Sequence, residues 1–167
     1  MSRIFSYIAL VLSIIFATVS CSSIRKYIFS FNEGIDKNIQ IYVDEVNAMN
    51  NGAFSKVDDI SFYNEPPSKT DGSYTIGYCA FNFTTFKPFI KINTHWWNDA
   101  SDKERILLTA HELRHCACKG KKMMHIDGTE GVFNCPKHYM HFQMANKLCI
   151  MFNYNKYVDQ IKKGCED

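Results

Sequence analysis

Two histidines and a glutamate stand together in the pattern H-E-x-x-H, formed by His111, Glu112 and His115. Residues four apart on a helix lie on one face, so both imidazoles can reach a single metal ion. Glu112 follows the first histidine, where its carboxylate can accept a proton from a metal-activated water. This spacing predicts metal-assisted hydrolysis, with His111 and His115 as metal ligands and Glu112 as general base. The bare pattern arises by chance in about one such chain in a hundred, so its surroundings must support it.

The residues before the motif predict the helix that it requires. Ser101 and Glu104 have the spacing of a capping box, which starts a helix at Ser101. Apolar residues then follow at helical spacing, and they are Ile106, Leu107, Leu108, Ala110 and Leu113. The motif therefore falls in the third and fourth turns of an amphipathic helix, on a face suited to metal binding.

A catalytic zinc site takes three protein ligands and leaves one position for water, so a further ligand must come from outside the motif. The downstream candidates are His125, Asp127, Glu130, His138 and His141. His125 comes first after the helix, where the chain could fold back over the metal. It is the preferred third ligand, and the other four remain open as alternatives.

Length and composition indicate one folded domain without a nucleic-acid partner. A chain of 167 residues can bury a substantial core. Hydrophobic residues make up 46% and aromatic residues 14%, which argues against disorder. The formal net charge of +2 gives no electrostatic reason to bind nucleic acid.

The N-terminus predicts export. A basic start precedes an apolar run over residues 4–19 that is short for a membrane-spanning helix, so residues 1–20 are expected to form a signal peptide. Cys21 follows in a context that partly matches a bacterial lipobox, which leaves lipidation of Cys21 and simple cleavage nearby as alternatives. Residues 21–34 are expected to be a tether, and residues 35–167 the domain.

Six cysteines remain after Cys21, an even number that suggests disulfides in an exported chain. Six cysteines allow fifteen connectivities, so the sequence alone does not pair them. A rival interpretation makes Cys116, Cys118 and Cys135 zinc ligands, but export and the adjacent histidine motif argue against it.

The pattern along the domain is that of an α+β fold, with a short β-sheet packed on the motif helix and closing helices at the C-terminus. In residues 88–93, Ile90 and Ile92 face one way and Phe89 and Lys91 the other, which is the clearest strand pattern. The other expected elements are a helix over 35–50, strands over 60–63 and 74–83, and helices over 139–151 and 154–161.

The order of these features resembles a known family. The chain resembles small zincin-type zinc metallopeptidases in the order of five features. These are a strand (Ile90 to Ile92), a tryptophan, the capped helix ending in His111–Cys116, a further histidine, and Cys135-Pro136 followed by Met140. Those proteins are often exported lipoproteins of bacteria or bacteriophages. The resemblance covers residues 88–140, and a more distant similarity links the chain to the metzincins, in which a methionine turn lies beneath the metal.

The resemblance implies a minimal zincin-like fold that binds Zn²⁺ through His111, His115 and His125, with Glu112 as the base and Met140 as the turn methionine. It also implies a disulfide between Cys116 and Cys135, with Cys118 as the alternative partner of Cys135. Two features depart from the family: Arg114 replaces a glycine and places a cation near the cleft, and the segment before His125 is longer. A peptide substrate would add to the strand around Ile90 to Ile92.

The expected function is that of an exported zinc-dependent peptidase, periplasmic, envelope-anchored or secreted, which hydrolyses peptide bonds in a peptide or protein substrate through a metal-activated water. The alternative is a non-catalytic envelope or virion-associated lipoprotein that keeps a zincin fold for structure or binding. Glu112 favours activity, because a purely structural zinc site is usually closed by four protein ligands and has no use for a neighbouring carboxylate.

Overall fold

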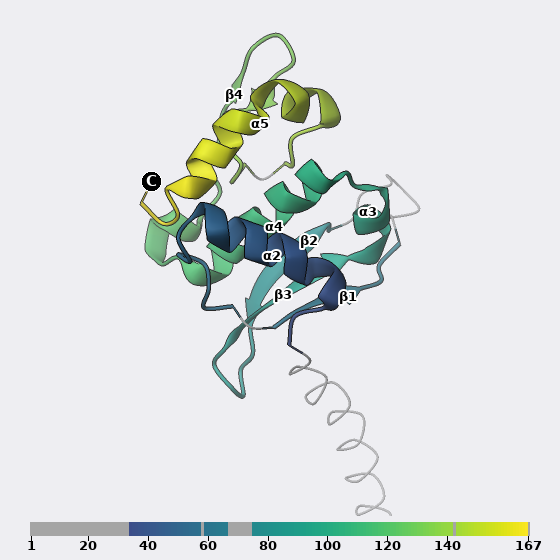
Figure 1. The fold of residues 1–167 in the computed structure, drawn as a ribbon, viewed down its shortest axis with the longest axis vertical. Helices are drawn as coiled ribbons and strands as arrows, with labels where there is room; N and C mark the ends of the chain where they lie inside the picture. Colours follow the sequence, from purple (N-terminus) through teal and green to yellow (C-terminus); the bar gives the residue numbers. More distant parts are fainter. Residues whose placement is uncertain (1–33, 58, 67–74, 142, 167) are drawn as a thin grey trace, which may run out of the picture. The chain divides into compact units, whose positions relative to one another are not determined.

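A helix packed against a small sheet forms the centre of the computed structural model, which describes residues 34–57, 59–66, 75–141 and 143–166 (Figure 1). The predicted α+β class is confirmed. The elements are α2 (Lys37–Met49), β1 (Ile60–Tyr63), β2 (Gly77–Phe81), β3 (Pro88–Asn93), α3 (Thr94–Asp99), α4 (Asp102–Ala117), the 3-10 helix η1 (Gly120–Met123), β4 (Thr129–Glu130), β5 (Cys135–Pro136) and α5 (Lys147–Lys162). The predicted signal peptide, the lipidation of Cys21 and all of the tether except Gly34 lie outside the described residues.

The larger sheet has the strand order β1-β3-β2, with β3 parallel to β1 and antiparallel to β2. Ile90 and Ile92 of β3 are buried against the helices, as their alternation predicts. The expectation that this strand accepts a peptide was wrong, because β3 is paired along both sides. β2 is the edge strand on the cleft side, and β1, which Ile35 bridges only at Ile60, forms the opposite edge.

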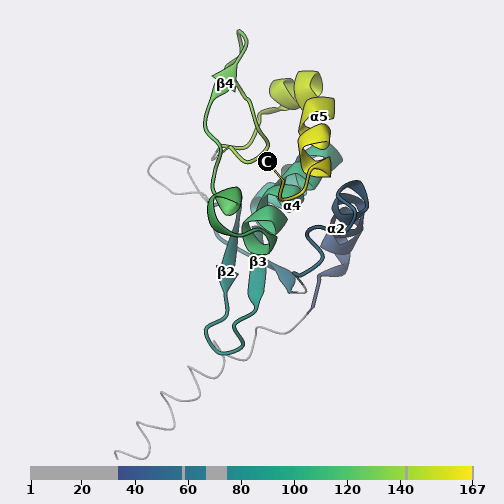
Figure 2. The same cartoon turned by 90° about the vertical axis from the view of Figure 1, so that its left-hand side faces the viewer.

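The motif helix α4 begins as predicted. The Ser101 hydroxyl accepts a hydrogen bond from the Glu104 backbone N–H at 3.5 Å, and the Glu104 carboxylate accepts one from the Ser101 N–H at 2.8 Å. The helix lies against β2 and β3 and is flanked by α2 and α5 (Figures 1 and 2). Leu107, Leu108 and Leu113 are fully buried there, and each such side chain contributes about 1.5–3 kcal/mol of hydrophobic stabilisation.

The C-terminal part of the described chain differs from the prediction of two closing helices. Residues 139–141 and 143–146 are not helical, and a single helix, α5, runs over Lys147–Lys162. The Asn146 side chain starts it by accepting a hydrogen bond from the Cys149 backbone N–H at 2.9 Å. Leu148 and Met151 are 50% and 61% exposed, so Met140, Met144, Leu148 and Met151, whose spacing predicted one apolar helix face, do not form one.

All six cysteines in the described domain form disulfides, which confirms that they are oxidised. The pairs are Cys79–Cys116, Cys118–Cys165 and Cys135–Cys149. The expected Cys116–Cys135 bridge and its Cys118–Cys135 alternative were wrong, because Cys116 meets β2 across the helix–sheet contact. Three disulfides are compatible with an exported protein in an oxidising compartment.

In the part of the chain that the structure describes, every helix is too short or too polar to span a bilayer.

Candidate metal centre and its cleft

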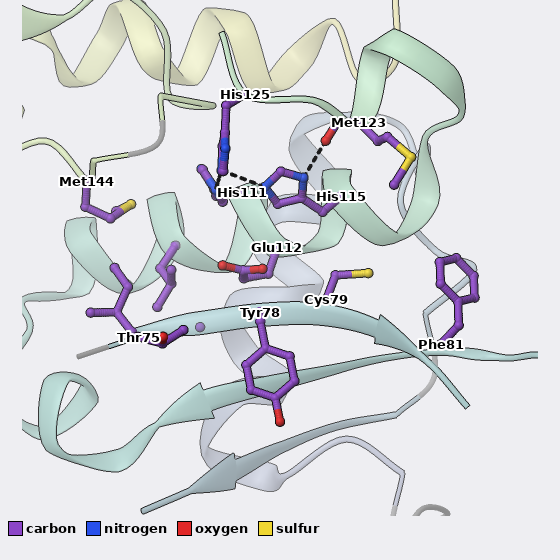
Figure 3. Close-up of a pocket in the computed structure, with 13 residues that line it drawn as sticks. Thr75, Tyr78, Cys79, Phe81, His111, Glu112, His115, Met123, His125 and Met144 are labelled. Atoms are coloured by element: carbon purple, nitrogen blue, oxygen red, sulfur yellow. Dashed lines mark hydrogen bonds between the residues drawn. The ribbon is translucent and has the colours of Figure 1, made fainter. Parts of the chain in front are cut away.

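Three histidine side chains converge on one point beside α4. The Nε2 atoms of His111 and His115 lie 2.9 Å apart, and each lies 3.2 Å from Nε2 of His125 (Figure 3). Three nitrogens bound tetrahedrally at about 2.0–2.1 Å from one ion would be separated by about 3.3 Å. The three imidazoles therefore have the spacing of a three-histidine metal site and could hold a metal ion.

Backbone carbonyls orient the two helical histidines. Nδ1 of His111 donates to the Tyr139 carbonyl at 3.0 Å, and Nδ1 of His115 donates to the Met123 carbonyl. With the proton held on Nδ1, each Nε2 presents a lone pair to the common point. Burial lowers the pKa of His111 to about 3 and also lowers the pKa of His115, which keeps both imidazoles in the neutral form that binds metals.

A tight turn over residues 138–141 ties the third histidine to the helix. The His141 N–H donates to the His138 carbonyl at 3.1 Å and closes the turn. Within it, the carbonyl of Met140 accepts from the Ile126 N–H at 3.0 Å, next to His125. Because the neighbouring Tyr139 carbonyl accepts a hydrogen bond from His111, one turn positions histidines from both segments, and Met140 within it is fully buried.

The other candidates for the third ligand lie elsewhere. His138 accepts a hydrogen bond from the Met140 N–H within the turn, and His141 accepts one from the Gln143 N–H. Glu130 pairs with Lys156 on α5. In the described chain the structure brings His125, and none of the four alternatives, to His111 and His115.

Arg114 braces the segments that hold the ligands. Its side chain is fully buried, and it does not line the cleft as a free cation would. Nε donates to the Lys122 carbonyl at 2.9 Å, one residue before the carbonyl that orients His115. Nη1 donates to the Tyr139 hydroxyl at 3.3 Å, on the residue that orients His111. Arg114 thus links the two segments whose carbonyls orient His115 and His111, a role that the sequence did not predict.

Glu112 is buried beside the three histidines, between them and β2 (Figure 3). Burial raises the pKa of Glu112 to about 8, and a hydrogen bond from the backbone of Cys79 acts in the opposite direction. Its Oε2 atom has no hydrogen-bond partner among the described residues. A buried carboxylate with an unmatched oxygen costs stability, so its presence needs a reason other than packing.

Strand β2 forms the wall opposite the histidines. Gly77 on this strand leaves room for Glu112, because a Cβ there would lie 3.1 Å from Oε1 of that carboxylate. The disulfide between Cys79 and Cys116 fastens the strand to α4 directly after His115. Neither contact is visible in the sequence, where nothing links residues 77–79 to the motif.

A cleft of about 620 Å³ opens over Glu112 and the three histidines. Apolar side chains dominate the rest of its lining, with Phe81 and Met144 at opposite ends in Figure 3. Apolar walls with a few converging polar groups are typical of ligand-binding sites.

The burial of Glu112 predicts a pH-dependent stability for the metal-free protein. Its pKa is about 8 when folded against a usual value of 4.5, so the folded state binds more protons between these values. Stability contributed by this group is therefore lost as the pH rises from 4.5 to 8. Glu112→Gln removes the titration and should stabilise the metal-free protein at pH 8 by about 4 kcal/mol relative to wild type, with little effect near pH 4.

Urea unfolding with a chelator present, at both pH values, measures this difference. Glu45→Gln removes an exposed carboxylate from α2 and is the control, for which we expect no comparable gain. His111 and His115 are unchanged in both variants, so their own titration cancels. An equal effect of Glu112→Gln at the two pH values would contradict the prediction.

No known protein family, curated protein or solved structure matches this chain.

Proposed function

We propose that the protein is an exported zinc-dependent peptidase of the zincin type. The observation that carries the proposal is the unmatched Oε2 of Glu112, which lies in the same cleft as the Nε2 atoms of His111, His115 and His125. A structural zinc site would be closed by a fourth protein ligand, and the described residues supply only three. The apolar run over residues 4–19 and the three disulfides support export.

The donor set fits zinc. Three neutral imidazoles with their nitrogens about 3 Å apart suit a tetrahedral ion that keeps one position for solvent. When bound there, Zn²⁺ would supply a Lewis acid and lower the pKa of water in its coordination shell. The hydrogen bonds from His111 and His115 to backbone carbonyls would hold the rings in place before metal or substrate arrives.

Glu112 would move the proton. A nearby cation favours the ionised carboxylate, so the high pKa of Glu112 would fall towards neutrality and make it a base at physiological pH. Its Oε2 would accept a proton from the attacking water and return it to the leaving nitrogen of the cleaved peptide. The hydrogen bond from the Cys79 backbone would hold the carboxylate in position during both transfers.

Strand β2 is the element on which a substrate would lie. The Asn93 N–H donates to the Ile76 carbonyl, and the alternation of antiparallel pairs then leaves the backbone groups of Gly77, Cys79 and Phe81 pointing away from β3. An extended peptide could add to this edge through the backbone of Gly77 and Phe81 and the Cys79 carbonyl and pass over Glu112, because the Cys79 N–H already donates to Glu112. The apolar cleft walls favour uncharged side chains next to the bond that is cut.

Metal removal tests the proposal. Protein purified from an oxidising compartment should contain about one zinc per chain and cleave members of a quenched-fluorescence peptide library. Dialysis against a chelator should abolish cleavage, and zinc should restore it, whereas magnesium should not. A zinc-free protein, or cleavage that resists complete metal removal, would overturn the assignment.

A further inference from the structure

The turn between β2 and β3 exposes three phenylalanines. Phe83 is 93% exposed, Phe86 83% and Phe81 50%. Single exposed apolar residues are common on soluble proteins, but Phe83 and Phe86 on one short turn, directly after Phe81 at the end of β2, form an exposed aromatic group that calls for a partner. Phe81 lines the cleft, whereas Phe83 and Phe86 lie beyond it.

The turn holds a defined shape without covering these side chains. The Asn82 side chain accepts hydrogen bonds from the N–H groups of Thr84 at 2.8 Å and Thr85 at 3.2 Å. The Asn82 carbonyl accepts from the Phe86 N–H at 2.8 Å. Phe86 has a φ of 54°, a left-handed conformation that glycine or asparagine adopts at lower cost. A phenylalanine at this strained position indicates that its side chain is needed there.

The direction of the chain at Gly34 and Ile35 shows where the domain begins relative to the tip of the β2–β3 hairpin, residues 82–87. One row across the sheet is formed by Ile35, Ile60, Ile90 and Cys79. On β2, Phe81 comes two residues after this row, at the end of the strand that leads into the tip. The bridge of Ile35 to Ile60 is parallel, so the chain enters the domain running away from the tip, in the direction of β3. Gly34, the first described residue, therefore lies at the end of the sheet to which the tip projects.

Before Gly34 the sequence carries the expected signal peptide, with its apolar run over residues 4–19, and then Cys21, whose lipidation would attach the chain to a bilayer. A fully extended segment 21–34 could span about 45 Å, so a tether alone would leave the domain free to turn. Residues 81–87 include no acidic side chain, and Lys87 gives this stretch a positive charge. An anionic bilayer surface would thus meet no acidic side chain in this stretch that would repel it.

A second exposed apolar patch provides the comparison. Val132 and Phe133, between β4 and β5, lie beside Phe152 of α5, and the rings of Phe133 and Phe152 stack 5.9 Å apart. In Figures 1 and 2 the β4 hairpin lies at the opposite end of the domain from the β2–β3 turn. It is far from the point where the chain enters.

We propose that Phe83 and Phe86 insert into the interfacial layer of the lipid bilayer from which the chain enters the domain. The exposed rings of Phe83 and Phe86 project from a turn, so they could enter the headgroup and upper acyl region of a bilayer, where aromatic rings are stable. Insertion would hold the domain upright on the membrane, with β2 and its cleft rising from the surface. This orientation does not depend on the proposed peptidase activity.

Fluorescence quenching by lipids tests the insertion. The full chain is reconstituted with vesicles of phosphatidylethanolamine and phosphatidylglycerol that carry brominated acyl chains. Tryptophan introduced as Phe83→Trp should be quenched roughly twofold or more, after subtraction of the signal from Trp96 and Trp97 in wild type. The matched variant Phe133→Trp, at the far end of the domain, should keep its fluorescence. Equal quenching of the two variants, or none at Phe83→Trp, would overturn the proposal.

Hydrogen exchange on the unsubstituted protein gives a second measurement that requires no variant to fold. Vesicles should slow amide exchange in residues 82–87 and leave residues 129–136 unchanged. Slowing in residues 82–87 by an unfolded polypeptide such as casein, with no effect of vesicles, would instead identify a protein-binding site and refute insertion.

Discussion

Glu112→Gln should leave the zinc in place and slow peptide hydrolysis by about 10²–10⁴-fold, the usual scale for losing a general base. The substitution keeps the shape of the side chain and its hydrogen bond from the Cys79 backbone but removes the proton acceptor. None of the three converging nitrogens belongs to this residue, so metal affinity should change little. Steady-state cleavage of one library-derived peptide, with zinc content measured on the same samples, provides the comparison.

The same variant separates the enzyme from its non-catalytic alternative. Glu45→Gln, purified in parallel, should retain the wild-type rate, which excludes an effect of handling. Equal rates for wild type and Glu112→Gln would assign the activity to a contaminant or another site. If neither protein turns over any member of a broad substrate panel, the fold serves binding or structure.

The sequence predicted the local parts of the site well. The capping box at Ser101 and Glu104 places the start of α4, because capping depends only on residues three positions apart. Alternation over Pro88–Asn93 gave the bounds of β3 and the buried face of Ile90 and Ile92. His125 was preferred on its order along the chain, and the structure brings it to the helical pair.

The errors concern pairings between distant segments. Alternation shows which face of a strand is buried but not how many neighbours it has, so β3 was mistaken for the strand that a peptide could extend. The partner of Cys116 is on β2, thirty-seven residues before it, and spacing carries no trace of that contact. The first part of the helix predicted over residues 139–151 does not form, because the carbonyls of Tyr139 and Met140 accept hydrogen bonds from His111 and the Ile126 N–H.

Backbone carbonyls outside the H-E-x-x-H motif orient its two histidines, so the motif alone does not account for the geometry of the site. Tyr139 and Met123 orient the helical histidines through main-chain oxygens that every residue type carries, so no sequence pattern reveals them. Arg114 is the side-chain signal that was available, since a buried arginine requires carbonyl or hydroxyl partners nearby. The Lys122 carbonyl and the Tyr139 hydroxyl accept hydrogen bonds from Arg114, which links the motif helix to the two segments that orient its histidines.

Removal of a single imidazole should abolish stable metal binding. His125→Ala leaves two ligands on α4, and we expect the zinc affinity to fall by more than about 100-fold, beyond the usual cost of losing a residue that only orients a ligand. His111→Ala should be at least as severe, because it removes one of the three nitrogens and, with it, a ring that the Tyr139 carbonyl already orients. Competition with a chromophoric chelator measures the affinity of each purified variant.

Two other histidines are matched controls for this experiment. His95 is exposed on α3, and His141 is buried in the turn yet lies outside the cluster, so His95→Ala and His141→Ala should bind zinc as wild type does. Zinc should raise the unfolding temperature of both controls but not that of His125→Ala, because a ligand stabilises only a folded state that binds it. Loss of zinc in His141→Ala with retention in His125→Ala would transfer the third-ligand role to the turn and overturn the assignment of His125.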